Sequence, residues 1–412
     1  MNASLVQLLL QNEPAALCAE VAHRHDGMAK LPIPGRKQFW IVSHPAAVAT
    51  VLTDRTTYDK GGPFYQVIAK ALGTTGLFTT NDDHLWQRLH DAMWPSLRRR
   101  ELEAAGVESL ASNLWLQRMQ NWNLRKPVEL FTEFKEFSIE LLAAYLFGAE
   151  VDNRRLARLA QAVFAGMAGR VFLPATFPGG RRYAKVTQEL LTEIDAIIAA
   201  RRTTLPRGTL LDALLHAEPS FTNVQVRDQV MTMLMAGHDS TATVLAWALI
   251  RLSEDDTLYA HLRHEALTSG YAMPASIAHV FRAAAHEHPA FPMFPRNVVR
   301  ATTLRKHRLR SGDQIVVSLQ GLQKSDGLSF EEFWEADTAG LTAAQRETHK
   351  PFGAGRRKCP GEDFAMQAAS IVLLHILREF DAIWRPRQNS GERSRYAMTA
   401  PPRDNAAMWL HR

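Results

Sequence analysis

The run PFGAGRRKCPGEDFAMQAA, at residues 351–369, constrains the fold of this chain more than any other segment. It places Cys359 on a glycine-rich loop that leads into apolar residues at helical spacing, so a helix is predicted to begin near Pro360. A thiol at a helix start faces free backbone N–H groups and the positive end of the helix dipole, which favour the thiolate. Glycines let the loop approach a flat partner closely, and Arg357 can reach an anionic group on that partner. A thiolate beneath a planar anionic ligand describes a haem iron site.

The chain has two cysteines, and a lone cysteine is usually a small buried hydrophobe. We keep that interpretation for Cys18. The spacing around the second cysteine closely resembles the cysteine loop of the cytochrome P-450 family: Phe352-x-x-Gly355-x-Arg357-x-Cys359-x-Gly361. The resemblance implies that Cys359 is the axial ligand of a haem b iron. It also implies cofactor contacts from Phe352, Gly353 and Gly361.

The length of 412 residues is enough to bury a large core, and it would allow two or three domains. However, no low-complexity linker, internal repeat or long charge run divides the sequence. Because the resemblance also spreads over most of the chain, we predict a single domain over residues 1–412. The resemblance implies a mainly α fold with a minor β part, with the haem between the long central helix and the cysteine-loop helix.

Hydrophobic periodicity and turn residues predict more helix than strand. The longest apolar periodic stretch predicts one helix over residues 222–253, about 45 Å long at 1.5 Å per residue. The other predicted elements are a strand region at 33–44, helices at 45–54 and 82–94, a mostly helical region at 101–216 with a loop at 172–183, and short strands at 298–304 and 313–319.

Charge and targeting signals narrow the expected partners. Two cysteines exclude a disulfide framework and suit a reducing cytoplasm, where we expect the protein. The N-terminal apolar run is broken at residues 12–14 and falls short of the roughly 20 apolar residues of a membrane span, so no membrane anchor is expected. The net charge is +6, but the basic residues form no stripe with interleaved aromatics, so nucleic acid is not an expected partner.

Two clusters of basic residues stand out, at Arg98–Arg100 and Arg356–Lys358. Scattered surface charge is the commoner explanation for either cluster alone. If both lay on the cysteine side of the haem, they would attract an acidic electron donor.

The predicted long helix carries an unusual segment near its centre: Ala236-Gly237-His238-Asp239-Ser240-Thr241. Ser and Thr can bond to carbonyls one turn earlier and bend a helix, and Asp239 and Ser240 offer an acid and an alcohol for moving protons. The segment resembles the family's oxygen-activation motif, Ala/Gly-Gly-x-Asp/Glu-Thr-Thr. That implies catalytic roles for Asp239, Ser240 and Thr241, and cofactor contacts from Ala236 and Gly237. In isolation, such a segment would more simply be a small-residue crossing point between helices.

The two propionates of a haem require several donors. Arg357 is one candidate, and by resemblance Arg296 matches the arginine that follows the family's proline-rich turn. Trp86 and His90 match the family's Trp-x-x-x-Arg, with His90 in place of the arginine. Taken separately, Trp86 would more often be a core tryptophan and His90 a surface histidine. Histidine also donates less reliably than arginine near neutral pH.

The sequence departs from the family where a Glu-x-x-Arg pair and a further arginine support the cysteine loop. The matching positions hold Ala283, His286 and Glu332. We predict that a protonated His286 pairs with Glu332, and that the small Ala283 leaves room for them. The alternative is that the two never meet and that packing alone holds the loop. Removing one partner of such a buried pair can cost about 3–5 kcal/mol.

The resemblance implies a haem-thiolate monooxygenase that uses O2 to oxidise a lipophilic small molecule in natural-product metabolism. No Gly-x-Gly-x-x-Gly fingerprint occurs, so electrons must come from a separate ferredoxin- or flavodoxin-type donor. The alternatives are a haem-thiolate enzyme that uses peroxide or rearranges its substrate, and a haem-free partner protein of the same fold. By family position, the side chains expected to line the pocket, each of which also suits an ordinary core, are Phe64, Val67, Ile68, Phe78, Val163, Phe164, Met167, Met235, Phe291, Met293 and Met398.

Overall fold

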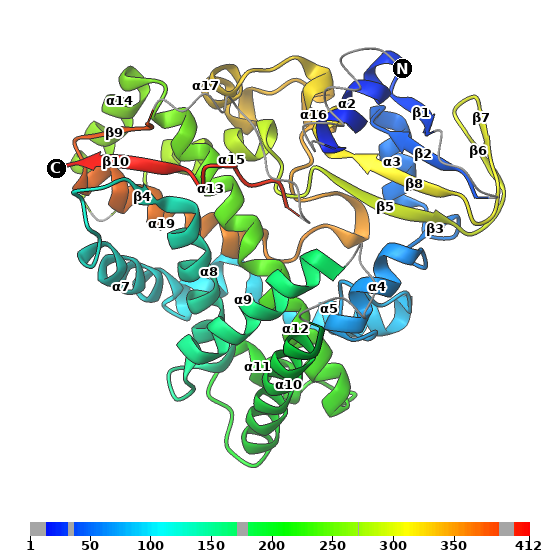
Figure 1. Cartoon of the computed structure of the whole chain (residues 1–412), viewed down its shortest axis with the longest axis horizontal. Coiled ribbons are helices and arrows are strands. Elements are labelled where there is room, and N and C mark those ends of the chain that lie inside the picture. The colour runs from blue at the N-terminus through cyan, green and yellow to red at the C-terminus, as the bar shows by residue number, and fades with distance from the viewer. Residues whose placement is uncertain (1–13, 32–36, 171–179, 271, 387–398) are drawn as a thin grey trace.

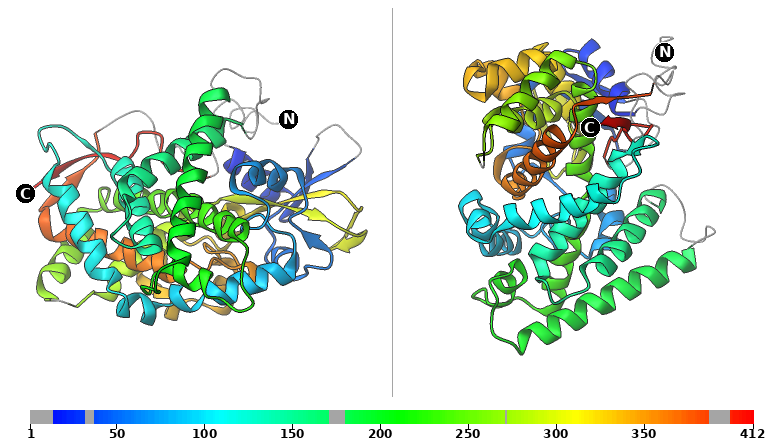
Figure 2. Two further views of the ribbon diagram at one scale, coloured as in Figure 1. Left: turned by 90° about the horizontal axis from the view of Figure 1, so that it is seen from below. Right: turned by 90° about the vertical axis from the view of Figure 1, so that its left-hand side faces the viewer.

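The computed structural model describes the chain except residues 1–13, 32–36, 171–179, 271 and 387–398. Helices form most of the molecule, and the largest sheet lies to one side of them, at the upper right of Figure 1. The sheet keeps that position when the molecule is viewed from below (Figure 2). The predicted mainly α fold with a minor β part is therefore confirmed. Among the described helices, none is both long and apolar enough to cross a bilayer.

The helices predicted at residues 45–54 and 82–94 are confirmed, each within one residue of its predicted ends. Up to residue 215 the helices of the structure are α2 (Pro14–Arg24), α3 (Pro45–Thr53), α4 (Pro63–Leu72), α5 (Asp83–Met93), α6 (Arg99–Ala104), α7 (Val107–Gln120), α8 (Leu130–Phe147), α9 (Asn153–Arg170), α10 (Gly180–Arg202) and α11 (Leu210–Leu215). Beyond it they are α12 (Asn223–Gly237), α13 (Asp239–Leu252), α14 (Asp256–Thr268), α15 (Ala275–Glu287), α16 (Leu319–Gln323), α17 (Phe330–Gly340), α18 (Ala343–Thr348) and α19 (Glu362–Glu379). Short 3₁₀ turns are η1 (Pro95–Leu97), η2 (Lys324–Asp326) and η3 (Gly355–Arg357).

The strands come from distant parts of the chain. The larger sheet has the order β1 (Met28–Leu31), β2 (Phe39–Val42), β8 (Gln314–Ser318), β5 (Met293–Val298) and β3 (Tyr58–Asp59). Only its β2–β8 pair is parallel. A three-stranded sheet has the order β4 (Val128–Glu129), β10 (Ala407–His411) and β9 (Ala382–Trp384). A two-stranded hairpin is formed by β6 (Thr302–Leu304) and β7 (His307–Leu309).

The predicted long helix is two helices, α12 and α13, which meet at His238. The break has a local cause, because hydroxyls on the first turns of α13 donate to carbonyls one turn earlier. Across the break, Ser240 Oγ donates to the Ala236 carbonyl at 2.9 Å, and Thr241 Oγ1 donates to the Gly237 carbonyl at 3.4 Å. The expected bend is therefore a full interruption of the helix.

The main hydrophobic core lies among α7, α8, α13, α15 and α19. Trp115, Phe134 and Phe137 are fully buried in it, with the Trp115 ring centroid 5.5 Å and 5.3 Å from those of the two phenylalanines. Because α19 buries its apolar side in this core, the loop before it is held at a fixed place. α19 begins at Glu362, two residues later than predicted, because Gly361 is its N-cap.

Candidate functional site

The cysteine loop is a closed turn between α18 and α19. The Cys359 N–H donates to the Phe352 carbonyl at 2.9 Å, and the Gly353 N–H donates to the Lys350 carbonyl at 2.8 Å. Gly353 and Gly355 have φ values of 74° and 68°, a region that side chains rarely adopt. A Cβ added at Gly353 would meet nothing within 4 Å, so the loop has open space beside it, as a flat ligand requires.

The expected effect of the helix start on the Cys359 thiol is present, but in the protein without a metal ion burial acts against it. Burial raises its pKa to about 11, although the Gly361 N–H and Lys358 act in the opposite direction. The desolvation of the thiolate thus outweighs the favourable helix end. Coordination to a metal ion deprotonates a thiol outright, so the thiolate form depends on the metal.

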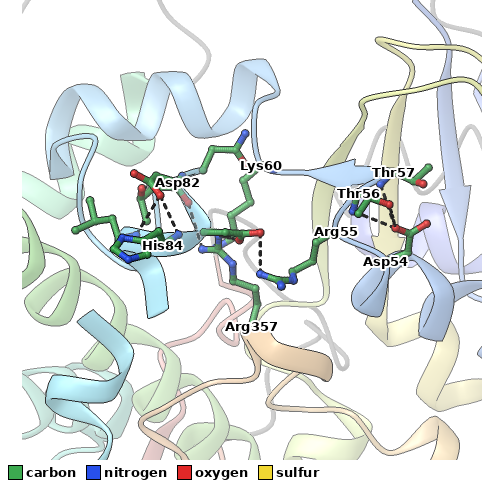
Figure 3. A network of polar contacts seen from close by, with 12 residues as sticks. Asp54, Arg55, Thr56, Thr57, Lys60, Asp82, His84 and Arg357 are labelled. Carbon is green, nitrogen blue, oxygen red and sulfur yellow. Dashed lines mark hydrogen bonds and ion pairs between the residues drawn. The ribbon is translucent and has the colours of Figure 1, made fainter. Parts of the chain in front are cut away.

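Three cations meet on one side of this loop, and we call Lys60, Arg296 and Arg357 the edge cluster. Arg357 Nη1 donates to the Leu77 and Thr80 carbonyls at 3.3 Å and 3.2 Å. Arg296 is 9% exposed, and its Nη1 donates to the Tyr65 hydroxyl at 2.8 Å. Figure 3 shows Arg357 extending from the cysteine loop toward the chain near Lys60 and the start of α5.

Lys60 was missed in the sequence analysis. Its ammonium donates to the Phe78 carbonyl at 3.0 Å and lies about 5 Å from the ring centroids of Tyr65 and Phe78. Burial, with Arg296 and Arg357 nearby, lowers the pKa of Lys60 well below its usual value. A lysine directly before the apolar, glycine-rich segment at residues 61–80 was the available signal, but only the fold brings it to the two arginines.

The edge cluster has more positive than negative charge. Burial, with Arg296 and Arg55 nearby, lowers the pKa of Arg357 to about 10, although Asp83 acts in the opposite direction. Asp83 pairs with Arg357 at 3.3 Å, but its side chain is 48% exposed. In the described part of the chain, no carboxylate pairs with Lys60 or Arg296. Enclosed cations without acids fit a ligand that carries its own carboxylates, as haem does.

Trp86 lies at the edge cluster, whereas His90 is set back from it. Arg356 and Arg357 cover the Trp86 ring at 5.0 Å and 4.9 Å from its centroid. The His90 ring stacks between Trp86 and Trp94, and its Nδ1 lies 3.2 Å from Asp91 Oδ1. Trp86 therefore supports the guanidinium of Arg357, and direct donation from His90 to a haem stays a prediction.

The predicted acid and alcohol lie at the break between α12 and α13 but have different partners. Asp239 is 5% exposed, its Oδ1 lies 3.2 Å from Lys135 Nζ, and its Oδ2 accepts a hydrogen bond from Thr399. Ser240 is only half-buried, and Thr241 Oγ1 donates to the Gly237 carbonyl at 3.4 Å. The structure thus places acid and alcohol side by side in the chain without a hydrogen bond between them.

Small residues at this break allow close packing of α8. A Cβ added at Gly237 would lie 2.6 Å from Leu142 Cδ2, so only glycine fits there without movement. His238 is fully buried, its Nδ1 lies 2.9 Å from the Leu234 carbonyl, and burial lowers its pKa to about 4. Ala236 and Gly237 remain half-buried, which leaves them surface that a ligand can cover.

The predicted pair of His286 and Glu332 is wrong. Glu332 is exposed, and its Oε2 accepts from the Ser329 N–H in a capping box at the start of α17. His286 lies instead 3.4 Å, from its Nε2, from Oδ1 of Asp326. The sequence signal Ser329-x-x-Glu332 is that of a helix cap, which explains why the glutamate faces its own helix start.

The predicted pocket residues fall into two groups. The core side chains, which are less than 9% exposed, are Ile68, Val163, Phe164 and Met235. The partly buried side chains, which retain surface that a ligand can cover, are Phe64, Val67, Phe78, Phe291 and Met293. Met398 and the side chain of Met167 lie outside the described residues.

The two basic clusters lie next to each other, although Arg357 turns inward to the edge cluster. The Arg99 N–H donates to Asp363 Oδ2 at 3.1 Å, which brings residues 98–100 to the start of α19. All three of these arginines are exposed, as is Lys358, which pairs with Glu362. The exposed basic surface on the cysteine side is therefore smaller than the sequence alone indicates.

Comparisons with known proteins agree with this geometry. The family model described as cytochrome P-450 matches residues 1–404. Cyclooctatin synthase of Streptomyces melanosporofaciens is 27% identical, over 96% of this chain and 91% of its own. Pentalenene oxygenase of Streptomyces avermitilis is 26% identical, over 88% of this chain and 85% of its own. The chain therefore belongs to the cytochrome P-450 family and is a haem monooxygenase.

Proposed function

We propose that this monooxygenase uses haem b, ligated by Cys359, to oxygenate a lipophilic small molecule. The observation that carries the proposal is the edge cluster beside the cysteine loop, because it supplies cationic donors for the carboxylates of that cofactor. When bound, haem supplies the redox chemistry that activates O2. Phe352, Gly353 and Gly361 of the cysteine loop would hold the cofactor together with Cys359, and the half-buried Ala236 and Gly237 would contribute further contacts to it.

Proton supply falls to the break between α12 and α13. Lys135 is 28% exposed, and its ion pair with Asp239 joins the solvent to a buried carboxylate. The adjacent Ser240 hydroxyl, which donates to the Ala236 carbonyl, can turn to pass a proton inward. An acid next to an alcohol is an arrangement suited to proton transfer. This assignment favours activation of O2 over the peroxide-dependent alternative.

The substrate class follows from the partly buried pocket residues, which are apolar and aromatic. Such a lining binds a lipophilic molecule by burial of apolar surface. The name of pentalenene oxygenase states an oxygenation of one small molecule. We extend this to an oxygenation in natural-product metabolism, without naming the substrate. The single-domain organisation is supported by the family match over residues 1–404.

The electron donor is proposed to be an acidic ferredoxin- or flavodoxin-type protein. The exposed Arg98–Arg100 segment, next to Asp363 at the start of α19, offers a basic surface on the cysteine side. The cytoplasmic location expected from the sequence stays a prediction.

A substrate screen with electron accounting tests the proposal. Lipophilic compounds that displace water from the haem should shift its absorption, and turnover of these compounds with a ferredoxin or flavodoxin should consume reductant and O2. Activity with peroxide but none with reductant would contradict it, and colourless protein would point to a haem-free partner protein.

A further inference from the structure

Three segments meet in a buried polar cluster next to the start of the cysteine loop. We call it the support cluster, and it consists of His286, Asp326 and His349. His286, from the last turn of α15, is 2% exposed, and the side chain of Asp326, from η2, is 5% exposed. Their Nε2 and Oδ1 atoms lie 3.4 Å apart. His349 follows α18 directly, and its Nδ1 lies 3.2 Å from Nδ1 of His286.

The rest of the contacts close the cluster. Asp326 also accepts from Thr348 Oγ1 at 2.5 Å and from the Leu328 N–H at 3.1 Å. The Phe333 ring covers both imidazoles, with centroid distances of 4.5 Å to His286 and 4.6 Å to His349. Each carboxylate oxygen of Asp326 thus has a donor within the protein, as a buried acid requires.

The charges can be assigned from these contacts. Burial raises the pKa of Asp326, but hydrogen bonds from His286, Thr348 and Leu328 outweigh it, so the net pKa lies below its usual value. Burial lowers the pKa of His349 to about 3, with His286, Lys350 and Arg282 acting in the same direction and Asp326 against it. At neutral pH, Asp326 is therefore an anion, His349 is neutral, and one proton lies between the two Nδ1 atoms.

The support cluster connects directly to the cysteine loop. Only two residues separate His349 from Phe352, whose carbonyl accepts the Cys359 N–H at 2.9 Å. Lys350, next to His349, accepts the Gly353 N–H at 2.8 Å. Gln323 ties the other side, since its Nε2 donates to the Ala285 and His286 carbonyls at 3.0 Å and 2.6 Å. A shift of His349 would therefore displace the turn that holds the sulfur.

We propose that His286, Asp326 and His349 are positioning residues that replace the missing Glu-x-x-Arg support and hold the Cys359 sulfur in the geometry for iron ligation. The proposal rests on the proposed ligation by Cys359. Asp326 supplies the carboxylate, and the imidazoles of His286 and His349 connect it to the start of the loop.

The test compares Asp326→Asn with Asp212→Asn and Glu332→Gln. Asp212 is a buried, ion-paired acid in α11, away from the loop, and so controls for general destabilisation. In the reduced protein with carbon monoxide, Asp326→Asn should convert the thiolate-type absorption band to the thiol-type band about tenfold faster, because a buried pair has lost its charge. Both control variants should stay within about twofold of the unmodified rate of band conversion.

Hydrogen exchange gives a second readout that does not need haem. The amides of Gly353 and Cys359 should exchange about tenfold faster in Asp326→Asn, since local opening frees them. If that variant fails to fold, His349→Gln and His349→Leu decide: glutamine keeps a polar partner for His286 and should preserve the band, whereas leucine should not. Equal band stability and equal exchange in all variants would overturn the proposal. Absence of a thiolate-type band in the unmodified protein would instead refute ligation by Cys359. Hydrogen exchange of the Gly353 and Cys359 amides in the haem-free protein would still test whether the support cluster holds the loop.

Discussion

The edge cluster and the support cluster are both polar groups enclosed beside the cysteine loop, but they differ in charge balance. Lys60, Arg296 and Arg357 bring positive charge together, and among the described residues only the half-exposed Asp83 pairs with one of them. In the support cluster, Asp326 faces His286 and accepts three hydrogen bonds from the protein. Because enclosed charge requires a partner, an unbalanced cluster indicates a ligand, and a balanced cluster indicates a structural role.

The largest effect at the edge cluster is expected for Arg357→Met. Loss of a charge-assisted hydrogen bond costs roughly 1.5–3 kcal/mol, so haem affinity should fall about 10- to 100-fold. The rate of haem transfer to a haem-free globin measures this. Arg356→Met is the matched control, since Arg356 covers the same Trp86 ring. Equal rates of haem transfer for the two variants would contradict the proposal that the edge cluster binds a ligand whereas the support cluster is structural.

Lys60 should make haem affinity depend on pH. Burial and the neighbouring arginines lower its pKa, whereas a haem carboxylate favours the protonated form. Its contribution is therefore full below the pKa of Lys60 in the haem-free protein and is lost as the pH rises through the higher pKa that a bound carboxylate gives Lys60. Lys60→Met should weaken affinity about tenfold at neutral pH. Haem titrations at increasing pH should show the gap between variant and unmodified protein closing, and a constant gap would exclude this role.

These two clusters also mark what the sequence could predict. Cys359, Arg296 and Arg357 were identified because each belongs to a local pattern with fixed spacing. Lys60 and Asp326 belong to no such pattern. The role of Lys60 arises when segments more than 200 residues apart come together, and that of Asp326 when segments separated by strands and short helices do. The burial that opposes the thiolate at Cys359 was not visible in the sequence for a related reason, because burial is a property of the whole fold. Short-range hydroxyl bonding, in contrast, correctly indicated the bend at residues 236–241.

Ser240→Ala should separate proton supply from cofactor binding. Ser240 belongs to neither cluster, so haem retention and the substrate-induced shift of the haem absorption should not change. Product formed per reductant consumed should fall about tenfold, with hydrogen peroxide released, because a positioned proton donor typically contributes about 100-fold or more to a step. Thr243→Val is the control, since the Thr243 hydroxyl bonds the Asp239 carbonyl within the buried helix. A preserved product ratio would remove Ser240 from the mechanism.

The exposed arginines should give the smallest effect, confined to a rate. Salt screens charges at a surface much more than enclosed charges. Reduction by an acidic donor should therefore slow several-fold as the ionic strength rises from about 0.01 to 0.15 M, while haem affinity changes little. Arg99→Gln should flatten this salt dependence. If salt removed haem instead, the division between exposed and enclosed cations would not hold.

The most direct test of the account is the carbon monoxide spectrum of the reduced protein and of Cys359→His. The proposed oxygenation depends on a sulfur ligand at the position of Cys359, held by the turn to Phe352. The account predicts the strongly red-shifted band of a thiolate-ligated haem in the unmodified protein and its loss in the variant. Survival of that band in Cys359→His would contradict the account.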